Sequence, residues 1–192
     1  MSDLAQIQPD LIEQLKPNAD FLAEIPLFGG LDHETRSYFS SKLQLIRLVP
    51  GQVVYEEGDT ARELYIVVSG SCGVFKPGER GDDMLNSLKA RDFFGDMSFI
   101  DMQHRSATVR AQENTVLWRL TYGALREAYL HDTKSYTLVV MNIAREMSRR
   151  LRRADYQRKS FADMPVNKRG PASVIGRIGL RAMTNLRRKD SR

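Results

Sequence analysis

Hydrophobic and polar positions alternate along the middle of the chain, and glycine and proline break the alternation at short intervals. The runs LIRLVPGQVVYEEGD (45–59), ELYIVVSGSCGVFKP (63–77) and SATVRAQENTVLWRL (106–120) each read as two short strands around a turn. β-Branched and aromatic residues are frequent in these runs, as they are in strands. Many short strands joined by glycine-containing turns are typical of a closed β-roll or jelly roll.

Helical periodicity replaces this alternation on both sides of the strands. Before them, apolar positions in residues 8–24 predict a helix that Pro17 breaks or kinks, and Asp32 is suited to cap a second short helix. After them, residues 121–131 are predicted to form a helix whose first residue is its cap. Residues 133–157 are predicted to form a longer helix.

The predicted long helix is apolar on more than one side. One stripe has residues at spacings of three and four, namely Tyr136, Val140, Ile143, Met147, Leu151 and Ala154. A second apolar edge, at Leu138 and Met141, is predicted to face the strands. A helix with two apolar faces needs two partners, which favours a homodimer through residues 133–157. The alternative is a single helix packed flat on its own domain.

These elements together predict an α+β chain. Its centre is an antiparallel β-roll of the jelly-roll, cupin-like kind, with short N-terminal helices and a long C-terminal dimerisation helix on its flanks. We divide the chain into an N-terminal helical extension (1–24), a central domain (25–157) and a basic tail (158–192).

Charge is distributed unevenly between the two parts of the chain. Residues 1–144 hold 14 Lys and Arg against 20 Asp and Glu, whereas residues 145–192 hold 15 against 4. A basic end favours an anionic partner, which can be an acidic protein, a nucleic acid or an anionic membrane surface. The alternative is that the basic residues only solvate a helix and a flexible end. We expect the tail, residues 158–192, to be disordered until something binds it.

One stretch, FFGDMSFIDMQHRSATV (93–109), places a Gly-Asp pair nine residues before Arg-Ser-Ala-Thr. It follows short helices and a β-roll, and two further helices close the chain. This order resembles the cyclic nucleotide-binding domain of catabolite activator proteins and protein kinase regulatory subunits, over roughly residues 25–157. VPGQVVYEEGD and ELYIVVSGSCGVF are similar to the roll glycines and strands of that family.

The resemblance implies that residues 93–109 contain a phosphate-binding cassette. A short helix between Gly95 and Gln103 would present backbone N–H groups to a cyclic phosphate, and Arg105 would add charge-assisted hydrogen bonds. The ligand-binding residues that the resemblance implies are Phe94, Gly95, Asp96, Met97, Ser98, Arg105, Ser106 and Ala107. In the activator-like arrangement, Asp155 at the end of the long helix lies near the base; the alternative is a solvated helix end. The plainer alternative for the Gly-Asp pair is an ordinary turn.

The cassette departs from the family at two positions. Asp96 stands where the family usually has a glutamate that holds the ribose, and it is shorter by about 1.5 Å of reach. Ser98 stands where the family prefers alanine. Ser106, in place of threonine, favours cAMP over cGMP by resemblance. The expected function is a cyclic nucleotide sensor that signals through the C-terminal helix and the basic tail; the alternative is a ligand-free scaffold whose tail docks a protein, membrane surface or nucleic acid.

Other chemistry is not expected from the sequence. The histidines His33, His104 and His131 are scattered, so we predict no metal site, and no P-loop or nucleophile motif indicates an enzyme. Only 35 residues follow Gln157, so we expect no helix-turn-helix and no sequence-specific DNA binding. Lone Cys72 and the lack of a signal sequence favour a cytoplasmic protein.

Overall fold

The computed structural model describes residues 15–79 and 81–162, and side chains as far as residue 156. The chain divides after Ala144 into two compact units, which are described separately below. Residues 8–14 of the first predicted helix and residues 163–192 of the predicted tail lie outside the described part of the chain.

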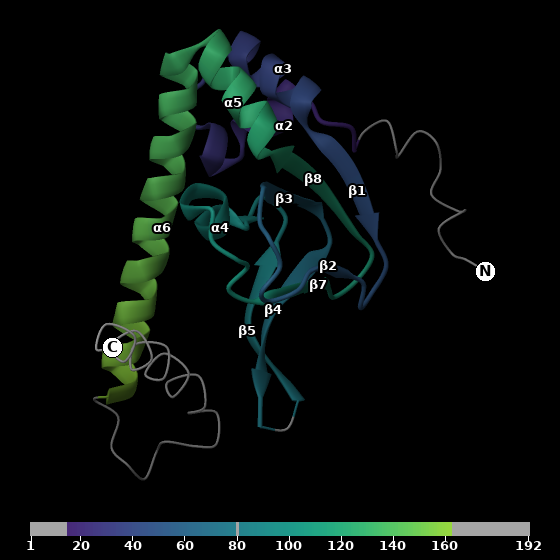
Figure 1. Ribbon diagram of the computed structural model, residues 1–192, viewed down its shortest axis with the longest axis vertical. Helices are drawn as coiled ribbons and strands as arrows, with labels where there is room; N and C mark the ends of the chain where they lie inside the picture. The colour runs from purple at the N-terminus through teal and green to yellow at the C-terminus, as the bar shows by residue number, and fades with distance from the viewer. Residues whose placement is uncertain (1–14, 80, 163–192) are drawn as a thin grey trace, which may run out of the picture. The chain divides into compact units, whose positions relative to one another are not determined.

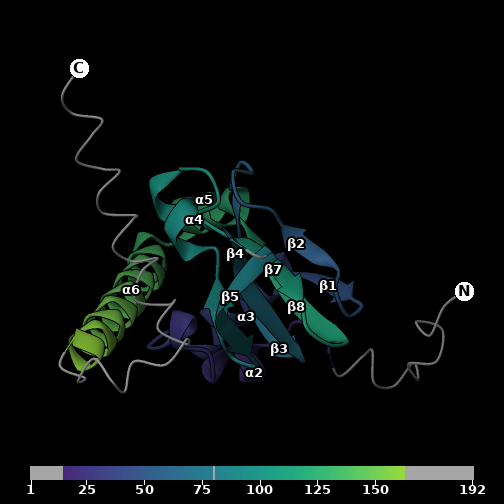
Figure 2. The ribbon, with the colours of Figure 1, turned by 90° about the horizontal axis from the view of Figure 1, so that it is seen from below.

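Two four-stranded antiparallel sheets form the first unit, as the sequence predicts (Figures 1 and 2). Their strand orders are β1-β8-β3-β6 and β2-β7-β4-β5. The strands are β1 (Gln44–Leu48), β2 (Val53–Tyr55), β3 (Glu63–Ser69), β4 (Ser71–Gly78), β5 (Gly81–Lys89), β6 (Phe93–Phe94), β7 (Thr108–Ala111) and β8 (Thr115–Thr121). Together they make the antiparallel β-roll expected from the alternating pattern.

The core of the roll lies between the two sheets. One sheet contributes Leu48, Tyr65, Val67, Phe94 and Leu117, and the other contributes Cys72, Leu88, Val109 and Ala111. Neighbouring residues of β8 point to opposite faces, because the side chains of a strand alternate. Trp118 is therefore buried on the outer face, where Phe21 meets its ring edge-on at 4.9 Å between centroids. The N-terminal segment thus covers the sheet that contains β8.

Short helices follow the predicted starts and caps. They are α2 (Ala19–Ala23), the 3-10 turn η2 (Pro26–Phe28), α3 (His33–Lys42), α4 (Asp96–Asp101) and α5 (Tyr122–His131). Asp32 accepts a hydrogen bond from the Thr35 N–H at 2.8 Å, and Thr121 accepts one from the Ala124 N–H at 3.1 Å. In the described part of the predicted 8–24 helix, only Ala19–Ala23 is α-helical, after Pro17. Figure 1 shows α2, α3 and α5 gathered at one end of β8.

The long helix α6 (Thr133–Ala162) is five residues longer than predicted. The boundary that we predicted between residues 157 and 158 therefore falls inside a helix, because no residue from 158 to 162 breaks helical geometry. The division of the chain into 1–24, 25–157 and 158–192 otherwise stays a prediction. Among the described residues, no helix is both long and apolar enough to cross a bilayer.

The buried face of α6 differs from the prediction. Val139 and Ile143 are fully buried, whereas Met141, which was expected to face the strands, is 46% exposed. Asn142 is also buried, and its side-chain amide donates to the carbonyls of Leu27 and Gly29 at 3.1 and 2.8 Å. Ile143 therefore packs inside its own unit and is not available to a dimer seam. Hydrophobicity alone did not distinguish the faces, since a polar side chain with two acceptors lies on the buried one.

The exposed residues of the predicted stripe lie toward the end of α6. Leu151 is 62% exposed and Ala154 is exposed, and both belong to the second unit. Tyr136 and Val140, in the first unit, are half-buried. Within the second unit, Leu151 and Ala154 are therefore the exposed apolar residues of the predicted stripe.

Candidate functional site

The turn from β6 into α4 brings the predicted Gly-Asp pair against the roll. β6 pairs with β3, with Phe94 opposite Tyr65, and Gly95 then takes a left-handed conformation with φ 79° and ψ 5°. The Phe99 N–H donates to the Gly95 carbonyl at 3.0 Å and closes the first turn of α4. The short helix predicted between Gly95 and Gln103 is therefore confirmed in position and length.

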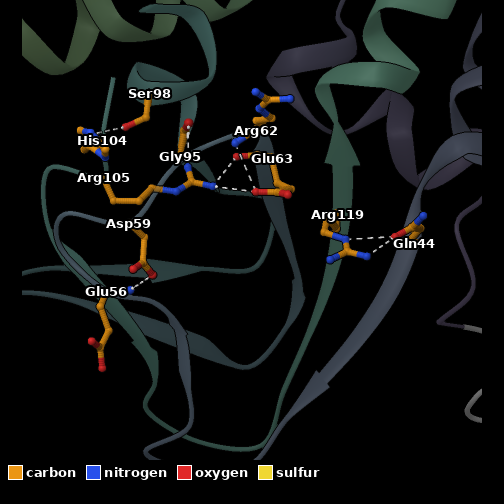
Figure 3. A network of polar contacts seen from close by, with 10 residues as sticks. All are labelled: Gln44, Glu56, Asp59, Arg62, Glu63, Gly95, Ser98, His104, Arg105 and Arg119. Atoms are coloured by element: carbon orange, nitrogen blue, oxygen red, sulfur yellow. Dashed lines mark hydrogen bonds and ion pairs between the residues drawn. The ribbon is translucent and has the colours of Figure 1, made fainter. Parts of the chain in front are cut away.

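Arg105 is a buried cation directly behind this turn, with 3% of its surface exposed. Figure 3 shows its guanidinium pointing at Gly95 and Glu63. Nη1 donates to the Gly95 carbonyl at 3.2 Å, and Nη2 donates to the Glu63 carbonyl at 2.8 Å. The same Nη2 lies 3.4 Å from the Glu63 carboxylate. Nε has no hydrogen-bond partner within the described part of the chain, so the cation retains capacity for an acceptor.

The backbone of Arg105 is held as firmly as its side chain. Its N–H donates to the Asp59 carbonyl at 2.8 Å, and its carbonyl accepts from the Gly58 N–H at 2.9 Å. These two bonds attach the end of the cassette to the loop between β2 and β3. The loop is closed by the Glu56 N–H, which donates to the Asp59 carboxylate at 2.8 Å (Figure 3). Arg105 is thus positioned by residues far from it in sequence.

Aromatic rings form a wall on one side of the guanidinium. The Arg105 Cζ lies 4.1 Å from the ring centroid of Tyr55 and 5.7 Å from that of Tyr65, and Tyr65 stacks on Phe94 at 5.4 Å. Burial raises the pKa of the Tyr55 hydroxyl, against a smaller lowering by the nearby charge of Arg105. Burial likewise raises the pKa of Tyr65. Both phenols therefore stay neutral near pH 7, and Arg105 is not neutralised by a phenolate.

The cassette residues that the sequence singled out are near one another but differ in exposure. Phe94, Asp96, Ser98 and Ala107 are buried, whereas Met97 and Ser106 are exposed. The Ser98 hydroxyl donates to the His104 carbonyl at 3.1 Å and ties α4 to the segment before Arg105 (Figure 3). Met97 is exposed together with Ile100 and Met102, so this side of α4 presents an apolar surface.

Comparison with known proteins decides the family. Residues 45–132 match the family model described as the cyclic nucleotide-binding domain. Residues 45–132 are a cyclic nucleotide-binding domain. The resemblance seen in the sequence is thereby confirmed, and the cassette at residues 93–109 lies inside the matched region.

Two curated relatives illustrate the range of proteins that carry this domain. The chain is 37% identical over 134 residues to the Cyclic AMP receptor protein of Thermus thermophilus. The aligned residues make up 69% of this chain and 60% of the relative. It is 34% identical over 107 residues to the cAMP-dependent protein kinase regulatory subunit of Hypocrea atroviridis, covering 56% of this chain and 22% of the relative. The match thus spans less than two thirds of either relative.

Solved structures support the same fold. The Thermus thermophilus Catabolite Activator Protein superimposes with a TM-score of 0.62 at 31% identity, covering 71% of this chain and 63% of that protein. A cyclic nucleotide-binding domain from Methylobacillus flagellatus gives a TM-score of 0.68 at 23% identity, over 80% of this chain and 86% of that chain. The second similarity shows the fold alone.

Three residues that contact Arg105 or lie beside it were not predicted from the sequence as part of the site. They are Glu63, Tyr55 and Tyr65, which lie on β2 and β3. The signal that was available is weak: two tyrosines within predicted strands and an acid at the start of one. Only the pairing of the strands brings them to a cation that is 42 residues after Glu63.

Two further expectations concern residues away from the cassette. Asp155 is exposed on α6 and belongs to the second unit, so its predicted place near the base stays a prediction. Within residues 15–79 and 81–162, no group of three or more His, Cys, Asp or Glu side chains is arranged to hold a metal ion. Cys72 is buried, and burial raises the pKa of its thiol to about 11.

Proposed function

We propose that this domain binds a cyclic mononucleotide, cAMP in preference to cGMP, and acts as a regulatory sensor. The observation that carries the proposal is Arg105, a buried cation with an unused Nε donor beside the left-handed Gly95 turn. A buried guanidinium is stable only with anionic or carbonyl acceptors, and a cyclic phosphate supplies two of them. The names of the curated relatives, which refer to cyclic AMP, support the choice of ligand.

The cassette residues have distinct roles in this proposal. Arg105 pairs with the phosphate, and backbone N–H groups at the start of α4 and at Ser106 and Ala107 donate to its oxygens. Asp96, buried at the first position of α4, accepts a hydrogen bond from the ribose hydroxyl. Phe94 and Tyr65 provide the apolar floor beneath the cation. Asp155 would accept a hydrogen bond from the base amino group if the end of α6 reaches it.

Isothermal titration calorimetry of Arg105→Ala against cAMP and cGMP tests this proposal. Loss of hydrogen bonds to a charged group weakens binding by roughly tenfold to a few hundredfold. Arg110→Ala is the matched control, because Arg110 lies on the same roll but pairs with Asp82 at the surface. We expect the control to bind as the wild type does. If Arg105→Ala binds with wild-type affinity, the assignment of a phosphate site at Arg105 is wrong.

Binding of the nucleotide is proposed to regulate a partner and not to start a reaction. The signal would pass through α6, which we propose to pair with a second copy through residues 133–157. The basic tail would then contact an anionic membrane surface or an acidic protein. We place the protein in the cytoplasm, because its one cysteine, Cys72, is suited to a reducing compartment.

A ligand-free scaffold is the second candidate. The observation that favours it is that Arg105 already has three internal acceptors: two backbone carbonyls and the Glu63 carboxylate. A site whose cation is already paired can lose its ligand in evolution and keep its fold. The calorimetry above distinguishes the two, since a scaffold would bind neither cAMP nor cGMP.

A further inference from the structure

Glu63 contacts the cation of the cassette in two different ways. Its backbone carbonyl accepts from Nη2 of Arg105 at 2.8 Å, and its side-chain carboxylate lies 3.4 Å from the same nitrogen. Glu63 is the first residue of β3, paired with Thr121 of β8. The sheet therefore fixes the carbonyl in place, whereas the carboxylate is held, within the described residues, only by Arg105 and by the Arg62 N–H, which donates to it at 3.3 Å (Figure 3).

We propose that the Glu63 carboxylate is a built-in competitor for the anionic ligand of Arg105 and that it sets the affinity of the domain. The proposal rests on the proposed function, because it concerns the same phosphate site. A carboxylate and a phosphate are both negative, and both are attracted to one guanidinium. When the phosphate arrives, the carboxylate must leave the cation or remain beside a second anion. Either outcome reduces the net free energy of binding.

The exposure of the Glu63 side chain indicates that a displaced carboxylate can turn into solvent. Its side chain is 31% exposed, whereas the side chain of Arg105 is 2% exposed. The carboxylate therefore lies at the boundary between the buried cation and water. It can rotate into solvent without leaving a charge buried, and the ion pair is only partly screened while it lasts. This arrangement permits an exchange of anions at Arg105.

Arg105 does not depend on this carboxylate for its position. Two backbone carbonyls accept from its terminal nitrogens, Tyr55 stacks at 4.1 Å, and the Asp59 carbonyl holds its N–H. The contact to the Glu63 carboxylate, at 3.4 Å, is the longest of the acceptor contacts of Nη1 and Nη2. Removal of the charge at residue 63 therefore leaves the cation in place and removes only the competing anion.

Asp96, the other acid of the cassette, has a different role in the proposed function. Asp96 is buried at the start of α4, and the proposed function assigns it to the ribose. The charge of Asp96 acts on the Tyr55 hydroxyl, whereas that of Glu63 acts on Tyr65. The two acids thus lie near different parts of the aromatic wall. Glu63 forms an ion pair with Arg105 at 3.4 Å, and its carboxylate is the partly exposed one that can turn into solvent.

The experiment is calorimetry of the full chain with cAMP, comparing wild type, Glu63→Gln and Glu57→Gln. Glutamine keeps the size of the side chain and removes its charge. We expect Glu63→Gln to bind about twofold to fivefold more tightly, the range for loss of one partly screened ion pair. Glu57 is the matched control, because it is an acid of the same roll that pairs with Lys76 at 2.8 Å and not with Arg105. We expect its variant to bind as the wild type does.

A third variant, Glu63→Asp, separates charge from structure. Aspartate retains the negative charge at a slightly greater distance, so its affinity should lie between those of the wild type and Glu63→Gln. Equal thermal unfolding temperatures of the ligand-free proteins would show that all of them fold. Affinity of Glu63→Gln equal to or weaker than a measurable wild-type affinity would overturn this inference alone. No binding by any of the proteins would overturn the proposed function together with the inference, whereas binding by Glu63→Gln only would support both.

Discussion

A β-carbon on Gly95 would lie 2.6 Å from Nη1 of Arg105, closer than real β-carbons approach other atoms. Gly95 also has a φ of 79°, which residues with a side chain rarely adopt. Two separate requirements thus select glycine at the turn into α4. The first is the left-handed backbone, and the second is the space that the buried cation occupies. The turn and the cation therefore depend on each other.

Replacement of Gly95 should affect binding more than folding. We expect Gly95→Ala to displace the Arg105 side chain and to weaken cAMP binding by at least about tenfold, besides destabilising the fold by roughly 1 kcal/mol. Gly30→Ala is the control, since Gly30 has a φ of 81° with no atom within 4 Å of an added β-carbon. Thermal unfolding should show a stability loss in both variants, and calorimetry should show a binding loss in the first variant only. Equal binding by both variants would contradict the link to Arg105.

Substitutions at Asp96 test whether this acid, which is shorter than the family's glutamate, still holds the ribose. If it does, Asp96→Ala should weaken cAMP binding by roughly tenfold to a hundredfold, for the loss of a hydrogen bond to a charged group. Asp96→Glu should retain or improve binding. Asp101→Ala, an exposed acid at the other end of α4, is the control and should bind normally. If both Asp96 variants titrate like the wild type, the carboxylate is only a turn residue.

The dimer proposal is best tested at Leu151 and not at Ile143. Ile143 is fully buried, so Ile143→Glu should unfold the protein, with a loss of more than about 3 kcal/mol for a buried unpaired charge. Leu151 is 62% exposed, so Leu151→Glu should keep the wild-type unfolding temperature and yield monomers in light scattering. A wild type that is already monomeric at tens of micromolar would rule out pairing through this helix.

Asn142 should stabilise the contact between α6 and the 3-10 turn η2. Asn142→Leu leaves the carbonyls of Leu27 and Gly29 without this donor, so we expect a loss of about 2–4 kcal/mol in urea unfolding. Asn86→Leu, at an exposed position of β5, should change stability by less than about 0.5 kcal/mol. Equal denaturation midpoints for the two variants would show that the buried amide contributes nothing.

Features that depend only on neighbouring residues could be predicted from the amino-acid sequence. The caps at Asp32 and Thr121, the glycine turns of the roll and the short helix after Gly95 were all predictable. Each of them follows from hydrogen bonds or backbone preferences that act within a few residues. The resemblance of residues 93–109 to a known cassette identified Arg105 for the same reason, because its motif is contiguous.

The residues that surround that cation, and the face of α6 that is buried, depend instead on contacts between segments far apart in the sequence. Glu63 is 42 residues before Arg105 and contacts it through strand pairing, a relationship that local periodicity does not contain. Asn142 donates to the carbonyls of Leu27 and Gly29, which are 115 and 113 residues earlier in the chain. These contacts turn Ile143 toward the interior and leave Met141 exposed. Apolar positions on several faces of a helix are equivalent until a neighbouring element covers one of them.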